Sequence, residues 1–213
     1  MDRDVSDTAF TDAVKRMQER QGSRDFYRRF EMEPRGTTRI TGELAQFIAA
    51  REHFYFATAS AKGAPYIQHR GGPKGFLKVL GEKELGFADF GGNQQYISLG
   101  NLSENPAAFI FLIDYVNRRR IKIWGEARAV ETDPALTRKL AETADGSRYR
   151  ARLERAILFT VTAWDVNCSA HILPRYTPDL LEPAFDRLEN RIKQLEAQVR
   201  ELGGDPGPFD HAG

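Results

Sequence analysis

The run HFYFATASAKGAPYIQHRGGPKGFLKVLGEKELGFAD occupies residues 53–89 and decides the fold class. Short stretches rich in aromatic and β-branched residues alternate in it with turn sequences that contain glycine and proline, a pattern typical of antiparallel hairpins. The turn at 61–65 predicts that the stretches on either side of it form the first hairpin. Within this run we predict strands over 54–60, 66–70, 76–80 and 84–89.

Three more strands follow, over 107–114, 120–130 and 156–164. Seven short strands joined by tight turns predict a mainly β (α+β) fold, an antiparallel barrel that is closed or nearly closed, because closure removes exposed sheet edges. Flanking helices are predicted over 8–20, from Thr41 onward, from Gly91 to about Leu102, and from Pro134 to about Ala144. Residues 22–40 are polar and basic, and we expect them to be irregular.

The C-terminal segment has a heptad pattern. Its apolar residues alternate spacings of four and three, with Leu at each d position and Phe, Ile and Val at a; they are Leu181, Phe185, Leu188, Ile192, Leu195, Val199 and Leu202. Glutamates fall at e, and Arg191 at g could pair with Glu196 of another chain. Two interpretations stay open: a parallel coil between two chains, or a terminal helix that packs on its own barrel.

These patterns divide the chain into four segments. We expect an N-terminal helix and irregular arm over 1–40, a barrel over 41–176, a coiled-coil-like helix over 178–203, and a flexible tail over 204–213.

Composition excludes several classes of protein. The 31 Lys and Arg balance 30 Asp and Glu, so no net field favours nucleic acid or a membrane surface. The longest apolar run, 109–113, is far too short to span a bilayer, and the first residues lack a signal-peptide core, so we expect a cytoplasmic protein. A lone cysteine, Cys168, fits a reducing compartment. The four histidines have no zinc-ligand spacing, so no metal site is predicted.

Two segments place glycines, amides and cations beside strand ends, residues 68–78 and 88–102. A Gly-Gly-Asn turn at 91–93 that opens a helix would present unpaired N–H groups to a phosphate. Arg70 could bind the same group in a bidentate manner. From the residues alone this is an anion or phosphate site on a barrel, and each glycine by itself is also compatible with an ordinary turn.

Residues 43–130 resemble the FMN-binding split barrel of the pyridoxamine 5'-phosphate oxidase superfamily. The matching pieces are 65–80, the Phe87–Tyr96 block and Asn101–Pro106. The resemblance implies a homodimer with FMN in the cleft between two barrels. Gln94 and Gln95 stand where that family commonly has Arg and Lys. The Arg and His substrate motif of the true oxidases is absent, so the chain is similar to a relative that acts on a different substrate.

The resemblance also implies roles for particular residues. Arg70 would meet the phosphate, and Phe76, Leu77 and Lys78 would line the ring. The remaining cofactor contacts that it implies are Ala88 and Asp89 on the next strand, Asn93, Gln94, Gln95 and Ser98 at the helix start, and Arg120 from across the dimer. No catalytic acid or base is identified. Further candidates for the substrate pocket or proton transfer are His69, His171, Arg175 and Tyr176.

We therefore expect an FMN-dependent oxidoreductase with a small-molecule substrate or a nicotinamide electron donor. Lys78 or Arg120 near the ring would stabilise the anionic reduced flavin. A first alternative is a non-catalytic carrier or sensor of flavin, deazaflavin or haem on the same barrel. A second is an interaction protein whose cofactor site has decayed, as Gln94 and Gln95 would allow. The arginines at 148, 150, 152 and 155 are expected on a solvated face.

Overall fold

The computed structural model describes residues 8–32, 38–143, 146 and 149–207. The chain divides into two units. The first comprises Met1–Asp114 and Arg118–Ile172 and holds the sheet; the second comprises Tyr115–Asn117 and Leu173–Gly213 and holds the C-terminal helix.

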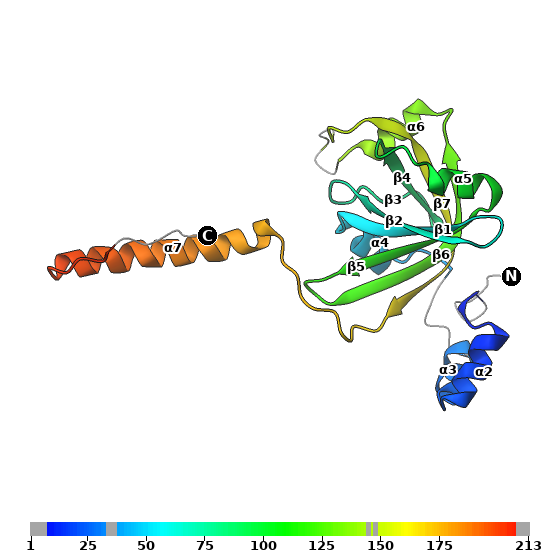
Figure 1. The fold of residues 1–213 in the computed structure, drawn as a ribbon, viewed down its shortest axis with the longest axis horizontal. Helices are drawn as coiled ribbons and strands as arrows, with labels where there is room; N and C mark the ends of the chain where they lie inside the picture. Colours follow the sequence, from blue (N-terminus) through cyan, green and yellow to red (C-terminus); the bar gives the residue numbers. More distant parts are fainter. Residues whose placement is uncertain (1–7, 33–37, 144–145, 147–148, 208–213) are drawn as a thin grey trace. The chain divides into compact units, whose positions relative to one another are not determined.

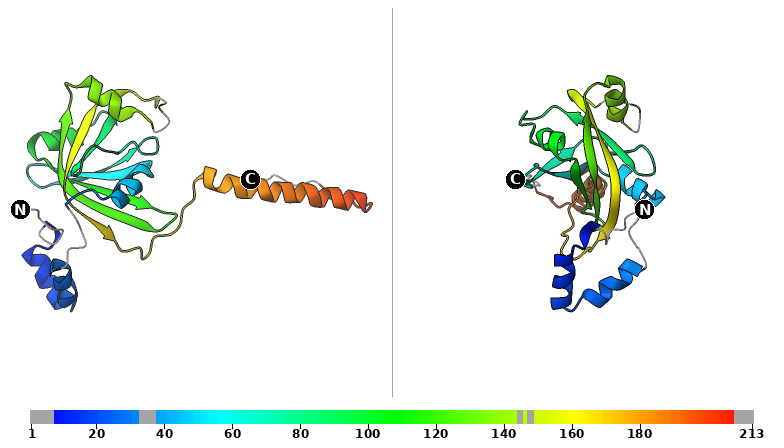
Figure 2. Two further views of the ribbon diagram at one scale, coloured as in Figure 1. Left: turned by 180° about the vertical axis from the view of Figure 1, so that it is seen from behind. Right: turned by 90° about the vertical axis from the view of Figure 1, so that its right-hand side faces the viewer.

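The first unit is built on a single seven-stranded antiparallel sheet in the order β2-β1-β5-β6-β7-β4-β3. Figure 1 shows these strands wrapped round a common interior, and Figure 2 shows the same curvature from two other sides. β2 and β3 lie at opposite ends of the order, so the sheet is an open, or split, barrel. The predicted fold and its strand number are confirmed. The strands are β1 His53–Ala59, β2 Pro65–Gly71, β3 Lys78–Val79, β4 Glu84–Phe90, β5 Ala107–Asp114, β6 Arg119–Val130 and β7 Leu153–Asn167.

β3 and β7 differ most from their predicted lengths. β3 has two residues rather than five, because the chain turns at Gly75 and the Phe76 amide donates to the Pro73 carbonyl. Phe76 and Leu77 then enter the core before the strand begins. β7 begins three residues earlier than predicted and ends three later, because it pairs with β4 over one stretch and with β6 over another.

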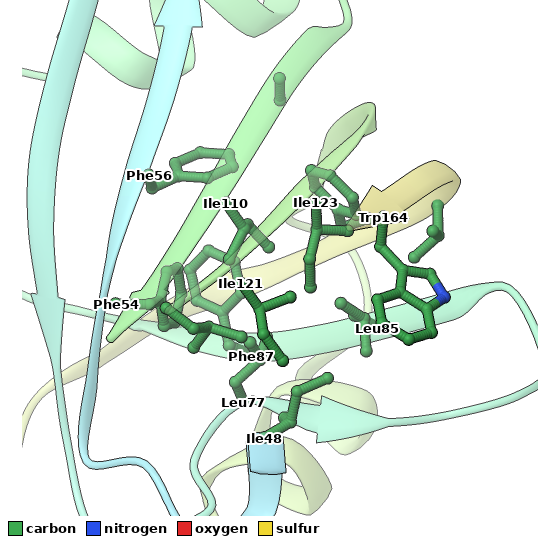
Figure 3. Packing of buried hydrophobic residues seen from close by; sticks show 14 of the residues in the cluster. Ile48, Phe54, Phe56, Leu77, Leu85, Phe87, Ile110, Ile121, Ile123 and Trp164 are labelled. Carbon is green, nitrogen blue, oxygen red and sulfur yellow. The ribbon is translucent and has the colours of Figure 1, made fainter. Parts of the chain in front are cut away.

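Aromatic side chains from opposite walls fill the barrel (Figure 3). Phe54 and Phe56 of β1 both meet the ring of Phe87 of β4 edge-on, at 5.1 and 5.7 Å between ring centroids. Ile110 and Ile121 from the neighbouring strands complete this layer, which water does not reach. Edge-to-face pairs add to the free energy gained by burying these rings.

Helices α4 (Gly42–Ala49) and α6 (Pro134–Ala141) bury apolar faces against the sheet. Thr41 caps α4 through a hydrogen bond from the Leu44 amide, as Asp133 caps α6 through the Leu136 amide. α4 adds Leu44, Phe47 and Ile48 to the main core, and α6 forms a second cluster with β4 and β7. α6 ends at Ala141, earlier than predicted, and residue 144 lies outside the described residues.

The described part of the N-terminal segment includes the short helices α2 (Asp12–Arg20) and α3 (Arg24–Met32). The prediction of an irregular stretch from residue 22 was wrong over α3. Arg24 explains the difference, because its guanidinium binds both Gln18 of α2 and Glu31 of its own helix, the latter at 2.9 Å. Residues 33–37 of the predicted arm lie outside the described residues.

The second unit consists mainly of α7 (Pro178–Glu201), which coincides with the predicted heptad helix over all but its last two residues. The tail predicted over 204–213 is described only as far as residue 207. Across the described residues, no helix combines the length and apolar character needed to cross a membrane.

The outer face of β1, β5 and β6 carries rings that are only half-buried, and Ile67 of the neighbouring β2 is exposed. Tyr55 lies opposite Phe111 in the register, and Phe109 lies opposite Trp124 with their rings 5.1 Å apart. Cross-strand aromatic pairs of this kind stabilise a sheet. They also leave an apolar surface, which we call the outer aromatic face: Tyr55, Ile67, Phe109, Phe111 and Trp124.

The irregularity between Trp124 and Gly125 of β6 leads to a stability prediction. A Cβ at Gly125 would lie 2.2 Å from the Thr160 carbonyl oxygen, so we expect Gly125→Ala to lower the free energy of unfolding by about 1–3 kcal/mol. Gly100→Ala in a helix, where a Cβ meets nothing, should instead raise it by roughly 0.5–1 kcal/mol. Urea unfolding midpoints measure both effects; equal midpoints would contradict the assigned β6–β7 packing.

Stability should also depend on pH through His53, whose ring stacks on that of His69 at 5.5 Å. Burial lowers the pKa of His53 below its usual value, and the positive charge of His69 lowers it further. As pH falls below about 6.5, the unfolded chain binds a proton that the folded chain resists, so the free energy of unfolding should fall until the folded-state pKa is passed. His53→Gln should flatten urea titrations between about pH 7.5 and 5.5. His171→Gln, at an exposed site, should leave the pH dependence of the unfolding free energy as it is in the wild type. The same pH dependence in His53→Gln would refute the assignment of this effect to His53.

Candidate functional site

A pocket opens where the two ends of the split sheet approach one another. β2, β4 and β7 supply strand residues to its wall, and the segment after β4 supplies the rest. It encloses about 400 Å³, counting its open mouth. Its lining residues are Tyr66, Gln68, Arg70, Asp89, Phe90, Gly92, Asn93, Gln94, Gln95, Tyr96, Ile97, Ser98, Leu99 and Glu154.

An ion pair between Arg70 of β2 and Asp89 of β4 forms the floor of this pocket. Strand alternation turns both side chains inward, and they are only 14% and 7% exposed. The sheet order separates β2 from β4 by four strands, so the pair connects the two sides of the split where backbone hydrogen bonds do not. Burial raises the pKa of Asp89, while Arg70 and Arg155 act in the opposite direction.

Arg155 of β7 holds the same carboxylate from the other side. It lies opposite Asp89 in the β4–β7 register, with its Nε 3.5 Å from the Asp89 Oδ2 atom, and it binds Glu131 and Glu154 at 2.7 Å each. The prediction of a solvated arginine face was therefore wrong at Arg155, whose side chain is 12% exposed. Arg148 of that set lies outside the described residues.

The charges around the pocket balance. Three cations, Arg70, Arg152 and Arg155, stand in ion pairs with three anions, Asp89, Glu131 and Glu154. Among the described residues, the buried Nε atoms of Arg70 and Arg155 still have no hydrogen-bond partner. A buried donor without an acceptor is costly, so Arg70, which lines the pocket, favours a group that brings its own oxygens.

The start of helix α5 (Ile97–Glu104) faces the pocket. The sequence places the helix start at the 91–93 turn, but the left-handed backbone of Gln94 and Tyr96, with φ of 61° and 54°, delays it to Ile97. Tyr96 occupies the N-cap position and its side chain makes no capping hydrogen bond. The first-turn N–H groups, at the positive end of the helix dipole, therefore receive no capping hydrogen bond from the Tyr96 side chain.

Two hydrogen bonds fix α5 to the sheet. The Ser98 hydroxyl donates to the Gln68 side-chain oxygen of β2 at 3.3 Å, and the Asn101 amide donates to the Thr58 hydroxyl of β1 at 2.9 Å. Both contacts join residues about 30 to 40 positions apart in the chain, and the buried polar pair of Asn101 and Thr58 was not singled out in the sequence. They tie α5 to β2 and β1, and Gln68 lies two residues before Arg70 on β2.

The pocket brings together six of the residues expected to contact a cofactor: Arg70, Asp89, Asn93, Gln94, Gln95 and Ser98. The other five do not line it. Phe76 and Leu77 pack in the barrel core, and Ala88 points to the cluster beneath α6. Lys78 lies on β3 at the far end of the sheet order, and the Arg120 Nε donates to the Cys168 carbonyl at 2.6 Å.

The remaining candidates also lie outside this pocket. His69 is on the outer face of β2, opposite Tyr55, and His171 is exposed with a left-handed φ of 61°. In the second unit, the Arg175 guanidinium lies over the Tyr115 ring at 4.5 Å, and Tyr176 is exposed. The described residues contain no group of three or more His, Cys, Asp or Glu side chains that could hold a metal ion.

Several solved structures are distantly similar to this chain. An FMN-binding protein from Syntrophomonas wolfei is 18% identical, with a TM-score of 0.45 over 58% of this chain and 83% of its own. A protein of the pyridoxinephosphate oxidase family from Clostridium acetobutylicum is 17% identical, with a TM-score of 0.43 over 64% and 93%. HutZ, the haem storage protein from Vibrio cholerae, is 18% identical, with a TM-score of 0.40 over 58% and 90%. No curated protein matches the chain.

The family assignment comes from the sequence itself. A family model described as pyridoxamine 5'-phosphate oxidase matches residues 40–175, which begin before α4 and include all seven strands of the sheet. The matched stretch is well over half of the 213 residues. The chain therefore belongs to the pyridoxamine 5'-phosphate oxidase family.

Proposed function

We propose that this protein binds FMN through the pocket beside Arg70 and uses it for electron or hydride transfer. The observation that carries the proposal is the start of α5, which has no side-chain N-cap and whose first residues line the same pocket as Arg70. A helix start and an arginine directed at one space form a common phosphate site. Family membership supports the flavin as the molecule to which that phosphate belongs.

The phosphate would be held mainly by hydrogen-bond donors and only weakly by net charge. The cations of the pocket are already paired, and the loop offers the amides of Asn93, Gln94 and Gln95 where lysine or arginine would add charge. Neutral donors stabilise an anion by less than charged ones do. We therefore expect modest affinity for FMN that changes little with ionic strength.

The ring would extend from the pocket toward a second barrel. The outer aromatic face supports a homodimer, because half-buried rings on three adjacent strands, together with Ile67 of β2, leave an apolar surface for another subunit to cover. Lys78 and Arg120 stay candidates for contacts with the ring in such a dimer. Phe76 and Leu77, with side chains in the core, would reach it only through their backbone.

The flavin supplies the redox chemistry, and the chain's residues position it. One observation favours the alternative of a non-catalytic carrier: the charged side chains that line the pocket, Arg70, Asp89 and Glu154, are all engaged in ion pairs. Bleaching of the bound flavin by NADH or NADPH, followed by recovery with an added acceptor, would support the enzyme. Bound flavin that neither donor reduces would support the carrier.

Gln68→Glu tests the phosphate site directly. The change keeps the shape of a side chain that lines the pocket but adds a negative charge beside the proposed phosphate, so the dissociation constant for FMN should rise about tenfold. Riboflavin lacks the phosphate, and its affinity should be unaffected. Gln46→Glu, the same change at an exposed position of α4, is the matched control. Fluorescence titration of the wild type and of the two variants measures these affinities. If Gln68→Glu lost as much affinity for riboflavin as for FMN, the proposed orientation would be contradicted.

Gln95→Arg tests the same site in the opposite direction. An arginine on the exposed loop adds a charged donor at the pocket mouth, so FMN should bind roughly five- to tenfold more tightly and the affinity should become sensitive to salt. Gln198→Arg on α7 is the control. Unchanged FMN affinity in Gln95→Arg would remove this loop from the site.

A further inference from the structure

Helix α7 has an apolar seam that stays unburied in the described part of the chain. Its 24 residues include none that are buried, and five of the seven heptad positions are between 37% and 87% exposed. Single helices of this length are marginal in water unless an apolar face is covered. The five exposed positions are Phe185, Leu188, Leu195, Val199 and Leu202. The seam runs along the whole helix, so a partner that covers it must be about as long as α7 itself.

The charges beside the seam identify that partner. All three e positions carry glutamate, at 182, 189 and 196, while g carries Ala184, Arg191 and Gln198. In a parallel pair, each g residue faces the e residue five positions on in the other helix, which places Arg191 against Glu196 twice by symmetry. In an antiparallel pair, e faces e, and the glutamates of both chains would repel one another.

The seam residues agree with a pair of helices. Ile192 and Val199 are β-branched residues at a, and every d position is Leu, the combination that favours two parallel strands. Pro183 lies at f, on the side of the helix away from the seam, where its ring does not interrupt the contact. Within one chain, Glu196 is bound by Arg200 at 3.3 Å, an exposed contact that contributes little and competes weakly with Arg191.

We propose that α7 pairs in parallel and in register with α7 of a second copy of this chain, through the Leu181–Leu202 seam and the Arg191–Glu196 ion pairs. The inference depends only on α7 and stands whether or not the barrel binds a flavin. Of the two interpretations that the sequence leaves open, it favours a parallel coil between two chains over a helix that packs on its own barrel. It also predicts a two-fold axis that runs along the coil.

Cysteine cross-linking of the full-length protein tests pairing and direction together. In a Cys168→Ser background, which removes the exposed native thiol, Val199→Cys should form a disulfide-linked dimer under mild oxidation. Equivalent seam positions of a parallel coil face one another within reach of a disulfide. Ala197→Cys, exposed at f on the same turn, is the matched control and should remain monomeric on a non-reducing gel.

Position 199 is off-centre, so the other arrangements give different results. In an antiparallel pair, a positions face d positions, so Val199→Cys would stay uncross-linked by itself but would link to Leu181→Cys or Leu188→Cys in a mixture of two proteins. A helix packed on its own barrel would give no seam-specific link in either experiment. Either result, or equal cross-linking at 197 and 199, would overturn the proposal.

The ion pair is tested by reversing it. In the Val199→Cys protein, Arg191→Glu places like charges against Glu196 of the other chain, and the rate of cross-linking should fall roughly threefold at low salt. Arg191→Glu combined with Glu196→Arg should restore the rate, and about 1 M salt should abolish the difference. A double variant no faster than Arg191→Glu alone would contradict the parallel register.

Discussion

The ion pair of Arg70 and Asp89 is the contact on which the site depends. It joins β2 to β4 across a split that the backbone ladder leaves open, and it does so with side chains only 14% and 7% exposed. Ion pairs so far from water gain little stability over apolar side chains of the same size, but removing one partner is strongly destabilising. Their value here is geometric, because the pair fixes the distance between the strands that form two walls of the pocket.

The packing of the core side chains also helps to set the distance between β2 and β4. Phe87 and Asp89 are two residues apart on β4, so they face the same side of the strand, and packing Phe87 against Phe54 and Phe56 aims Asp89 at Arg70. Arg155, opposite Asp89 on β7, prevents the carboxylate from turning away. The pocket is therefore a product of barrel packing, with a loop and the start of α5 added at its mouth.

Sequence patterns predicted the elements whose formation depends on residues close together in the chain. The hairpin at 61–65, the capped helices and the heptads follow from nearest neighbours, and the structure has them where expected. Arg155 was missed because its burial depends on Asp89, which is 66 positions away in the chain, and a row of arginines by itself resembles a solvated face. The start of α5 was misplaced because the left-handed conformations of Gln94 and Tyr96 carry no glycine signal. The roles of Phe76 and Leu77 in the core depend on a turn whose partner, Arg51, is also distant.

The heptad helix has a consequence for the behaviour of the protein at low concentration. A coil that joins two chains converts the meeting of their barrels from an encounter in solution into an event within one molecule, where the local concentration of the second barrel reaches the millimolar range for a short connection. Two individually weak contacts then hold together at dilutions where either alone would dissociate. A cofactor enclosed between the barrels would then be retained at concentrations of the chain too low for the barrels to meet by themselves.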